Sequence, residues 1–313
     1  MNRRQILLAT ALSCLPLSAL QAQATEVTIL YTAASPFVAI FVAQDQGFFA
    51  DHGLNTTLQL AQNGSVIVSG VVSGSAQVGL PTPTVVLQAM DNGLDLRVIA
   101  ATNLFPDATA AGVVVAADSG ITTPAELNGH MIGVPGIGGL LDVVMRKWVD
   151  ANGGDSSTLN VVEFALPQTA DVLRGHQMDA VATLDPFLGR AVDSGAGVHI
   201  GNYTDVITPG SAAGVLTVTA DWAEANPDAI TGLQEALDEA AAFIVTNPDE
   251  ARAAIAHYTT LPPPVIAGIA FPNISDLHLT PASFTFWQDL ALEQGLITAP
   301  VDLDTLIIPF GGN

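Results

Sequence analysis

The chain has 313 residues, of which 49% are hydrophobic and 12% are charged, and its formal net charge at pH 7 is −22. A chain of this length can bury a sizeable core, and about two domains are expected from it. The negative charge argues against nucleic acids and anionic membrane surfaces as partners, because both would be repelled. Cys14 is the single cysteine, so a disulfide within the chain is excluded.

The N-terminus has the features of an export signal. A basic pair, Arg3-Arg4, precedes the mostly apolar segment 6–20, and Ala22-Gln23-Ala24 fits a signal-peptidase site. We therefore expect residues 1–24 to be removed as a signal peptide. The arginine pair also fits a twin-arginine signal loosely, and Cys14 lies in a poor lipidation sequence, so the export route and lipidation stay open.

Strand-like and helix-like segments alternate after the signal, which predicts an α/β fold. The expected strands are 27–31, 56–60, 77–80, 96–101, 113–116, 131–134, 161–164 and 180–184. The expected helices are 36–50, 66–72, 84–90, one beginning at 123, 139–151, 169–175, two between 221 and 258, and 281–294.

Three loops share one pattern, in which a strand-like apolar run leads through Gly, Pro, Ser or Thr into a helix-like segment. They are 31–36, 78–84 and 133–139. Each should present free backbone N–H groups and hydroxyls at a helix N-terminus, where polar and anionic groups are favoured. None of the three contains an evident nucleophile, general base or metal ligand. The pattern therefore favours binding of a small molecule without chemistry on it.

Other functional motifs are incomplete in this chain. Gly136 and Gly138 begin a dinucleotide-binding fingerprint, but Leu141 stands where its third glycine belongs. The histidines do not fall at metal-ligand spacing, and no Ser lies in a Gly-x-Ser-x-Gly motif. We therefore expect no catalytic residue, no cofactor and no metal site.

Five short segments carry a resemblance to a known family that covers nearly the whole chain after the signal. They are 43–54, 73–79, 174–180, 226–228 and 247–251. In order and spacing they resemble the periplasmic solute-binding proteins of ABC importers, and most closely the branch that includes nitrate, sulfonate, taurine and thiamine-pyrimidine binders. Gln77 departs from the pattern, because the family usually has Asp there.

The resemblance implies a type II periplasmic-binding-protein fold, an α/β fold of two lobes, each a sheet flanked by helices, joined by a hinge. The chain would cross between lobes near 105–111 and near 209–215. Lobe 1 is then expected to comprise 25–108 and 215–313, and lobe 2 to comprise 109–214. The family's function implies a periplasmic monomer that captures a small molecule and delivers it to ABC permease subunits.

Ligands of open α/β sheets bind at the carboxyl ends of strands, and the resemblance matches the loops there to the family's binding loops. The predicted ligand-binding residues are Ser35, Pro36, Phe37, Gly64, Ser65, Pro81, Thr82, Asn103, Gly136, Ile137, Gly138, Gly139, Asp185 and Phe187. A polar or anionic head with an apolar or aromatic body fits them, as in sulfonates, aromatic carboxylates and pyrimidines. Asp185 either contacts an amino group of the ligand, as the resemblance implies, or caps the next helix.

Two other functions are considered. A pyrimidine-precursor synthase has the same fold, but that activity requires a lysine in the binding site and a cysteine-rich segment. Lys147, the only lysine, is expected inside a helix, and no cysteine follows the signal, so we expect no enzymatic activity. A sensor that presents its ligand to a receptor cannot be distinguished from a transport protein by sequence.

Overall fold

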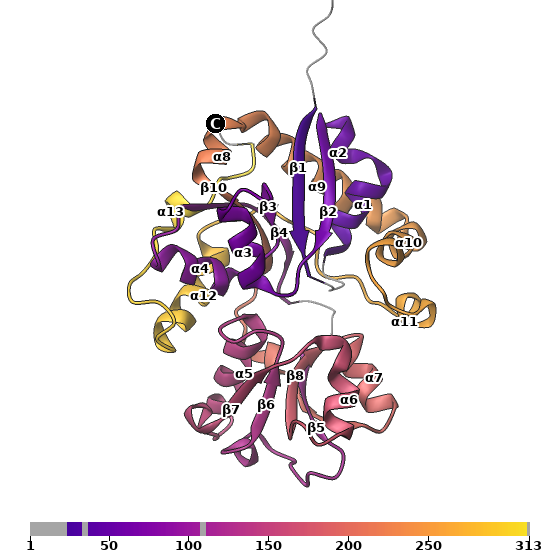
Figure 1. The fold of residues 1–313 in the computed structure, drawn as a ribbon, viewed down its shortest axis with the longest axis vertical. Coiled ribbons are helices and arrows are strands. Elements are labelled where there is room, and N and C mark those ends of the chain that lie inside the picture. The colour runs from indigo at the N-terminus through magenta and orange to yellow at the C-terminus, as the bar shows by residue number, and fades with distance from the viewer. Residues whose placement is uncertain (1–23, 33–36, 107–110, 312–313) are drawn as a thin grey trace, which may run out of the picture.

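The computed structural model describes residues 24–32, 37–106 and 111–311, and these residues form two five-stranded sheets, each flanked by helices (Figure 1). Residues 1–23 of the predicted signal peptide, and Ser35 and Pro36 of the predicted site, lie outside the described residues. Within the described ranges, no helix has the length and apolar character needed to cross a bilayer. We call each sheet with the helices that pack on it a lobe.

The first lobe contains the sheet with strand order β2-β1-β3-β10-β4. Its strands are β1 (Thr25–Tyr31), β2 (Leu54–Leu60), β3 (Val78–Gly79), β4 (Leu96–Leu104) and β10 (Ala212–Thr219). β1 runs parallel to β2 and β3, whereas β10 runs antiparallel to β3 and β4. The strands β1, β2, β3 and β4 therefore end at the same edge of the sheet.

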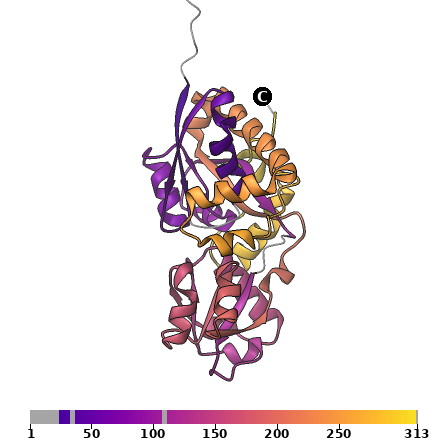
Figure 2. The ribbon, with the colours of Figure 1, turned by 90° about the vertical axis from the view of Figure 1, so that its right-hand side faces the viewer.

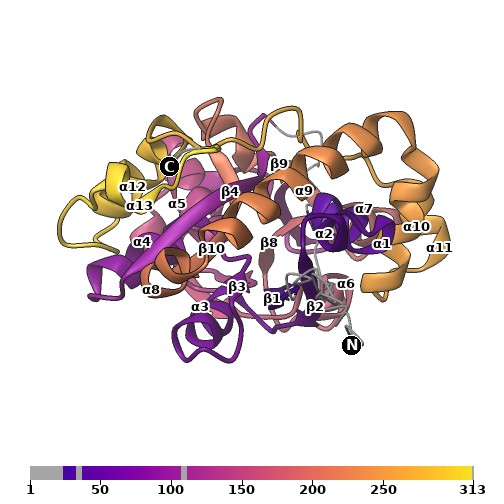
Figure 3. The same cartoon turned by 90° about the horizontal axis from the view of Figure 1, so that it is seen from above.

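Ten helices of the first lobe are described. They are α1 (Val38–Gln46), α2 (Phe48–Asp51), α3 (Gly64–Val72), α4 (Pro83–Asp91), α8 (Ala220–Ala225), α9 (Pro227–Thr246), α10 (Pro248–Tyr258), α11 (Pro263–Ala267), α12 (Ala282–Glu293) and α13 (Leu303–Leu306). Seen from above, α9 crosses the sheet from the side of β4 toward α1 and α10 (Figure 3).

The second lobe contains the sheet with strand order β7-β6-β8-β5-β9. Its strands are β5 (Ala111–Ala116), β6 (Met131–Val134), β7 (Asn160–Glu163), β8 (Ala180–Leu184) and β9 (Gly197–Gly201), and its α-helices are α5 (Leu140–Ala151), α6 (Thr169–Arg174) and α7 (Phe187–Asp193). β6 runs parallel to β7 and β8, so these three strands also end at one edge. Figure 2 shows the two lobes stacked along the long axis of the molecule.

The central strands form where the sequence has unbroken apolar runs, as expected for strands covered by helices on both faces. Every residue of β8 is buried, and β4 is buried over most of its length. Side chains and prolines then fix where helices begin. Asn63 accepts a hydrogen bond from the Val66 N–H at 3.0 Å at the start of α3, and Pro83 is the first residue of α4.

Most expected elements occur within a few residues of their predicted bounds, but β9 and α7 occur where no element was predicted, and three other segments differ from the prediction. The helix expected over 36–50 is two helices, because Gly47 adopts φ 84° and ends α1. The helix expected to begin at 123 is a short 3-10 helix, Pro124–Leu127. β10 begins at Ala212, where sequence analysis expected only a crossing between lobes. The lobe boundaries themselves stay a prediction.

One hydrophobic cluster joins the two lobes. It includes Leu87 of α4, Trp287 of α12 and Val144 of α5, all of them fully buried. The ring of Phe105, just after β4, lies 6.3 Å from the Trp287 ring. The second lobe therefore packs on α4 and α12 of the first lobe, which fixes the position of α5.

Gly79 is required by close packing at the centre of the first sheet. A Cβ atom there would overlap Cγ2 of Ile67 and lie 2.9 Å from Cγ2 of Val71, both on α3. We expect Gly79→Ala to lower the free energy of unfolding by about 1–3 kcal/mol through overpacking. At the exposed Gly268, the nearest atom lies 3.6 Å from the position that a Cβ would take. Gly268→Ala should therefore change the free energy of unfolding by less than about 0.5 kcal/mol. Urea denaturation measures both, and equal effects would contradict this packing.

Candidate ligand-binding site

A cavity of about 400 Å³ is lined by residues of both lobes. This volume is in the range that small organic ligands occupy in proteins. The first-lobe part of its lining comes from 60–65 after β2, 80–82 after β3, the end of β4, and Thr32 and Phe37. The second-lobe part comes from 135–137 after β6, 163–167 at and after the end of β7, and Leu184 at the end of β8. Strand ends from both sheets therefore meet at one cavity, as open α/β sheets favour.

The structure brings most of the predicted binding residues to this cavity. Those that line it are Phe37, Gly64, Ser65, Pro81, Thr82, Asn103, Gly136, Ile137 and Gly139. Their contact with a ligand stays a prediction.

Three predicted residues are not among those that line the cavity. The Gly138 carbonyl accepts a hydrogen bond from Gln88 Nε2 at 2.9 Å. Asp185 Oδ1 accepts the Gly189 N–H at 3.0 Å, which is the capping alternative that the sequence left open. Phe187 is buried at the start of α7.

Sequence reasoning missed several lining residues of the cavity. Gln62 and Asn63 follow β2, and Glu163 and Phe164 lie at the end of β7. The rule that selects strand ends gave Gly64 and Ser65 after β2 but not their neighbours Gln62 and Asn63. Applied to β7 as well, it would have found Glu163 and Phe164. Tyr203 has no such signal, because it lies in a 3-10 helix of the second lobe. Its buried hydroxyl donates to the Thr183 carbonyl at 2.7 Å, and burial raises the pKa of Tyr203 well above its ordinary value.

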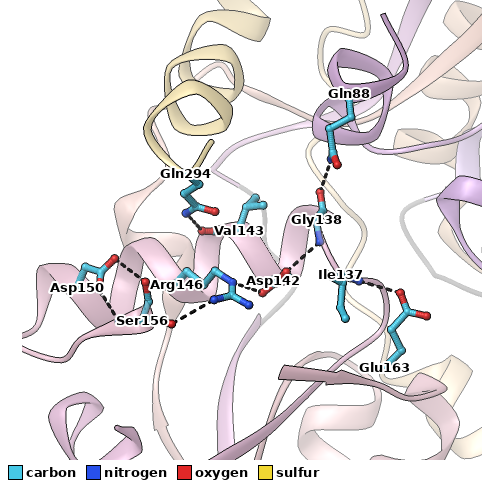
Figure 4. Close-up of polar contacts among 10 residues, drawn as sticks. All are labelled: Gln88, Ile137, Gly138, Asp142, Val143, Arg146, Asp150, Ser156, Glu163 and Gln294. Carbon is cyan, nitrogen blue, oxygen red and sulfur yellow. Dashed lines mark hydrogen bonds and ion pairs between the residues drawn. The ribbon is translucent and has the colours of Figure 1, made fainter. Parts of the chain in front are cut away.

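In the loop before α5, two backbone N–H groups that were predicted to be free are hydrogen-bonded within the chain. The Ile137 N–H donates to Glu163 Oε1 at 2.9 Å, and the Gly138 N–H donates to Asp142 Oδ2 at 2.9 Å (Figure 4). Sequence analysis expected these N–H groups to be free for a ligand. Instead, carboxylates of the chain itself engage two of them, Asp142 from the first turn of α5 and Glu163 from the end of β7.

Asp142 is a buried carboxylate, 2% exposed, in the first turn of α5. Its Oδ1 accepts from Arg146 Nε at 2.7 Å, while Arg146 also donates from Nη1 to the Ser156 carbonyl at 3.1 Å (Figure 4). A buried charge is tolerated only when it is paired and hydrogen-bonded. Asp142 therefore depends on Arg146 and the Gly138 N–H, and it fixes the loop against α5.

Polar contacts along α5 hold it to the first lobe. Gln88 of α4 reaches Gly138 at its start, and Gln294, just after α12, donates from Nε2 to the Val143 carbonyl at 2.7 Å. The Lys147 ammonium contacts both Glu293 carboxylate oxygens, at 2.7 and 2.8 Å. These contacts place one wall of the cavity at a fixed distance from α4 and α12.

Within residues 24–32, 37–106 and 111–311, no group of three or more His, Cys, Asp or Glu side chains is arranged to hold a metal ion.

Removing the Asp142 carboxylate should be costly. We expect Asp142→Ala to lower the free energy of unfolding by about 3 kcal/mol, because the Gly138 N–H and the Arg146 guanidinium lose their partner. Asp171→Ala is the matched control, because its pair with Arg174 spans 3.5 Å and both side chains are more than half exposed. It should cost less than about 1 kcal/mol. Chemical denaturation compares them, and a small loss in Asp142→Ala would refute this role.

Residues 34–251 match the model of a family described as NMT1/THI5 like. Among curated relatives, the formylaminopyrimidine-binding protein of Halalkalibacterium halodurans is 23% identical over 213 residues, which cover 68% of this chain and 63% of the relative. The chain thus spans less than two thirds of the length of this relative.

Solved structures share the fold. The alkanesulfonate-binding protein SsuA of Xanthomonas axonopodis pv. citri, bound to MOPS, matches with a TM-score of 0.76 and 17% identity over 92% of this chain and 99% of its own. The nitrate-binding protein NrtA of Synechocystis PCC 6803 matches with a TM-score of 0.76 and 16% identity over 90% of this chain and 84% of its own. The desulfurization enzyme DszB also matches, with a TM-score of 0.67 and 16% identity over 91% of this chain and 96% of its own. These likenesses show the periplasmic-binding-protein fold and leave activity open.

Proposed function

The chain belongs to the NMT1/THI5-like family, and we propose that it is the substrate-binding protein of an ABC importer. The observation that carries the proposal is the cavity of about 400 Å³ lined by the strand-end loops of both lobes. A ligand there touches both lobes at once, so binding favours the arrangement in which they face each other. A protein that captures one small molecule needs this geometry and no catalytic group.

The names of related proteins also support a function in binding a small molecule. The formylaminopyrimidine-, alkanesulfonate- and nitrate-binding proteins are all named for a small molecule that they bind. In this proposal the signal peptide directs the chain to the periplasm, where the monomer captures its ligand and delivers it to the permease subunits. The ligand is a small organic molecule with a polar head and an apolar body, because Phe37, Phe105 and Phe164 lie in the same lining as Thr82 and Asn103.

A substitution that places a large side chain in the cavity should abolish ligand binding without disturbing the fold. Gly136 lines the cavity, and no described atom lies within 4 Å of a Cβ placed there, so a larger side chain would project into open space. We expect Gly136→Phe to remove the ligand that native mass spectrometry detects on the wild-type protein, and to abolish the ligand-induced rise in melting temperature.

The control is Gly268→Phe, because Gly268 is exposed and is not among the residues that line the cavity. It should keep the bound mass and the thermal shift. Equal binding by Gly136→Phe and the wild-type protein would place the ligand elsewhere and contradict the proposal. Absence of any bound small molecule, after exposure to a cell extract, would contradict a capture function as a whole.

A further inference from the structure

We propose that the ligand carries a positively charged nitrogen, such as an ammonium or amidinium group, and that this group binds the Glu163 carboxylate. The cavity would then discriminate against anions, unlike the sites of the alkanesulfonate- and nitrate-binding proteins named above. The inference rests on the proposed function, since it assigns the chemistry of the same cavity.

Glu163 is placed to receive such a group. It is the last residue of β7, it lines the cavity, and its side chain is exposed. Its Oε1 accepts the Ile137 N–H at 2.9 Å, which fixes the orientation of the carboxylate. Among the described residues, none hydrogen-bonds to Oε2. One carboxylate oxygen is therefore held by the backbone and the other is open to a donor from a ligand.

The same loop is unfavourable for an anion. The Gly138 N–H, which would otherwise favour negative charge at the start of α5, is engaged by the buried Asp142 carboxylate. The neighbouring Ile137 N–H is engaged by Glu163. An anionic head would have to displace these carboxylates from their donors and then lie beside them, against like-charge repulsion.

Basic side chains do not offset this charge. Glu163 is the single charged residue among the described residues that line the cavity. The sequence positions 33–36 and 107–110 contain no Lys, Arg or His. Arg190 is exposed on α7 and is not among the residues that line the cavity. Five other Lys and Arg residues pair with acids of their own lobe or the facing helix. These pairs are Arg97–Asp95, Arg146–Asp142, Lys147–Glu293, Arg174–Asp171 and Arg252–Asp249.

The rest of the lining suits a cation with an apolar body. Phe164 follows Glu163 directly, and Phe37 and Phe105 lie in the first-lobe part of the lining. Aromatic faces attract cations and also cover the apolar part of a ligand. The net charge of −22 adds a negative potential that favours the approach of cations over anions.

The test uses probes with one body and different heads: benzylamine, benzamidine, benzyl alcohol and benzenesulfonate. Isothermal titration at low ionic strength measures each against the wild-type protein, Glu163→Gln and Glu250→Gln. Gln keeps an oxygen for the Ile137 N–H but loses the charge, so the fold should be unaffected. Glu250 is exposed on α10, is not among the residues that line the cavity, and serves as the matched control.

We expect the two cationic probes to bind about 10-fold to 100-fold more tightly than benzyl alcohol, because hydrogen bonds to charged groups are the stronger ones. Glu163→Gln should remove this difference and leave the affinity for benzyl alcohol unchanged, while Glu250→Gln should change neither. Benzenesulfonate should not bind to the wild-type protein.

Tighter binding of benzenesulfonate than of benzylamine, or equal binding of the cations by Glu163→Gln and the wild-type protein, would overturn the inference. In either case the cavity would still bind a small molecule and the proposed function would stand. If no probe binds and Gly136→Phe does not alter any bound mass, the proposed function fails, and the inference fails with it.

Discussion

The wall of the cavity depends on one buried carboxylate. Asp142 holds the Gly138 N–H and is itself held by Arg146, so the loop before α5 has a defined shape although it is rich in glycine. With the loop fixed in this way, the Ile137 N–H lies within reach of Glu163, and the Gly138 carbonyl lies within reach of Gln88. Removal of that charge would release contacts to β7 and to the other lobe together.

The cavity combines chemical groups from both lobes that neither lobe provides alone. Parallel strands in each sheet end at a common edge, and the packing of α5 on α4 and α12 turns the two edges toward each other. The first lobe supplies hydroxyl and amide groups such as Thr82 and Asn63, and the second supplies the carboxylate of Glu163. Recognition of a ligand at this cavity would therefore combine neutral hydrogen bonding on one side with charge on the other.

Local pattern in the sequence located every strand except β9 and β10, because apolar runs such as β8 are buried on both faces wherever helices cover a sheet. The same pattern located Thr82 and Gly136, which follow strands directly. It could not reveal that Glu163 accepts from Ile137, since this contact joins residues 26 positions apart and exists only after β6 and β7 pair. The capping role of Asp185 could be predicted from the sequence, because its partner Gly189 lies only four residues further along the chain.

The contacts between α5 and the first lobe also restrict how the molecule can move. Gln294 and Glu293 engage α5 at Val143 and Lys147, about one turn apart, and Gln88 engages Gly138 in the loop just before this helix. A rotation of the lobes that keeps these contacts intact would have its axis close to α5. The far edges of the lobes, carrying α10 and α11 above and α6 and α7 below (Figure 1), would then travel farthest and form the mouth through which a ligand passes.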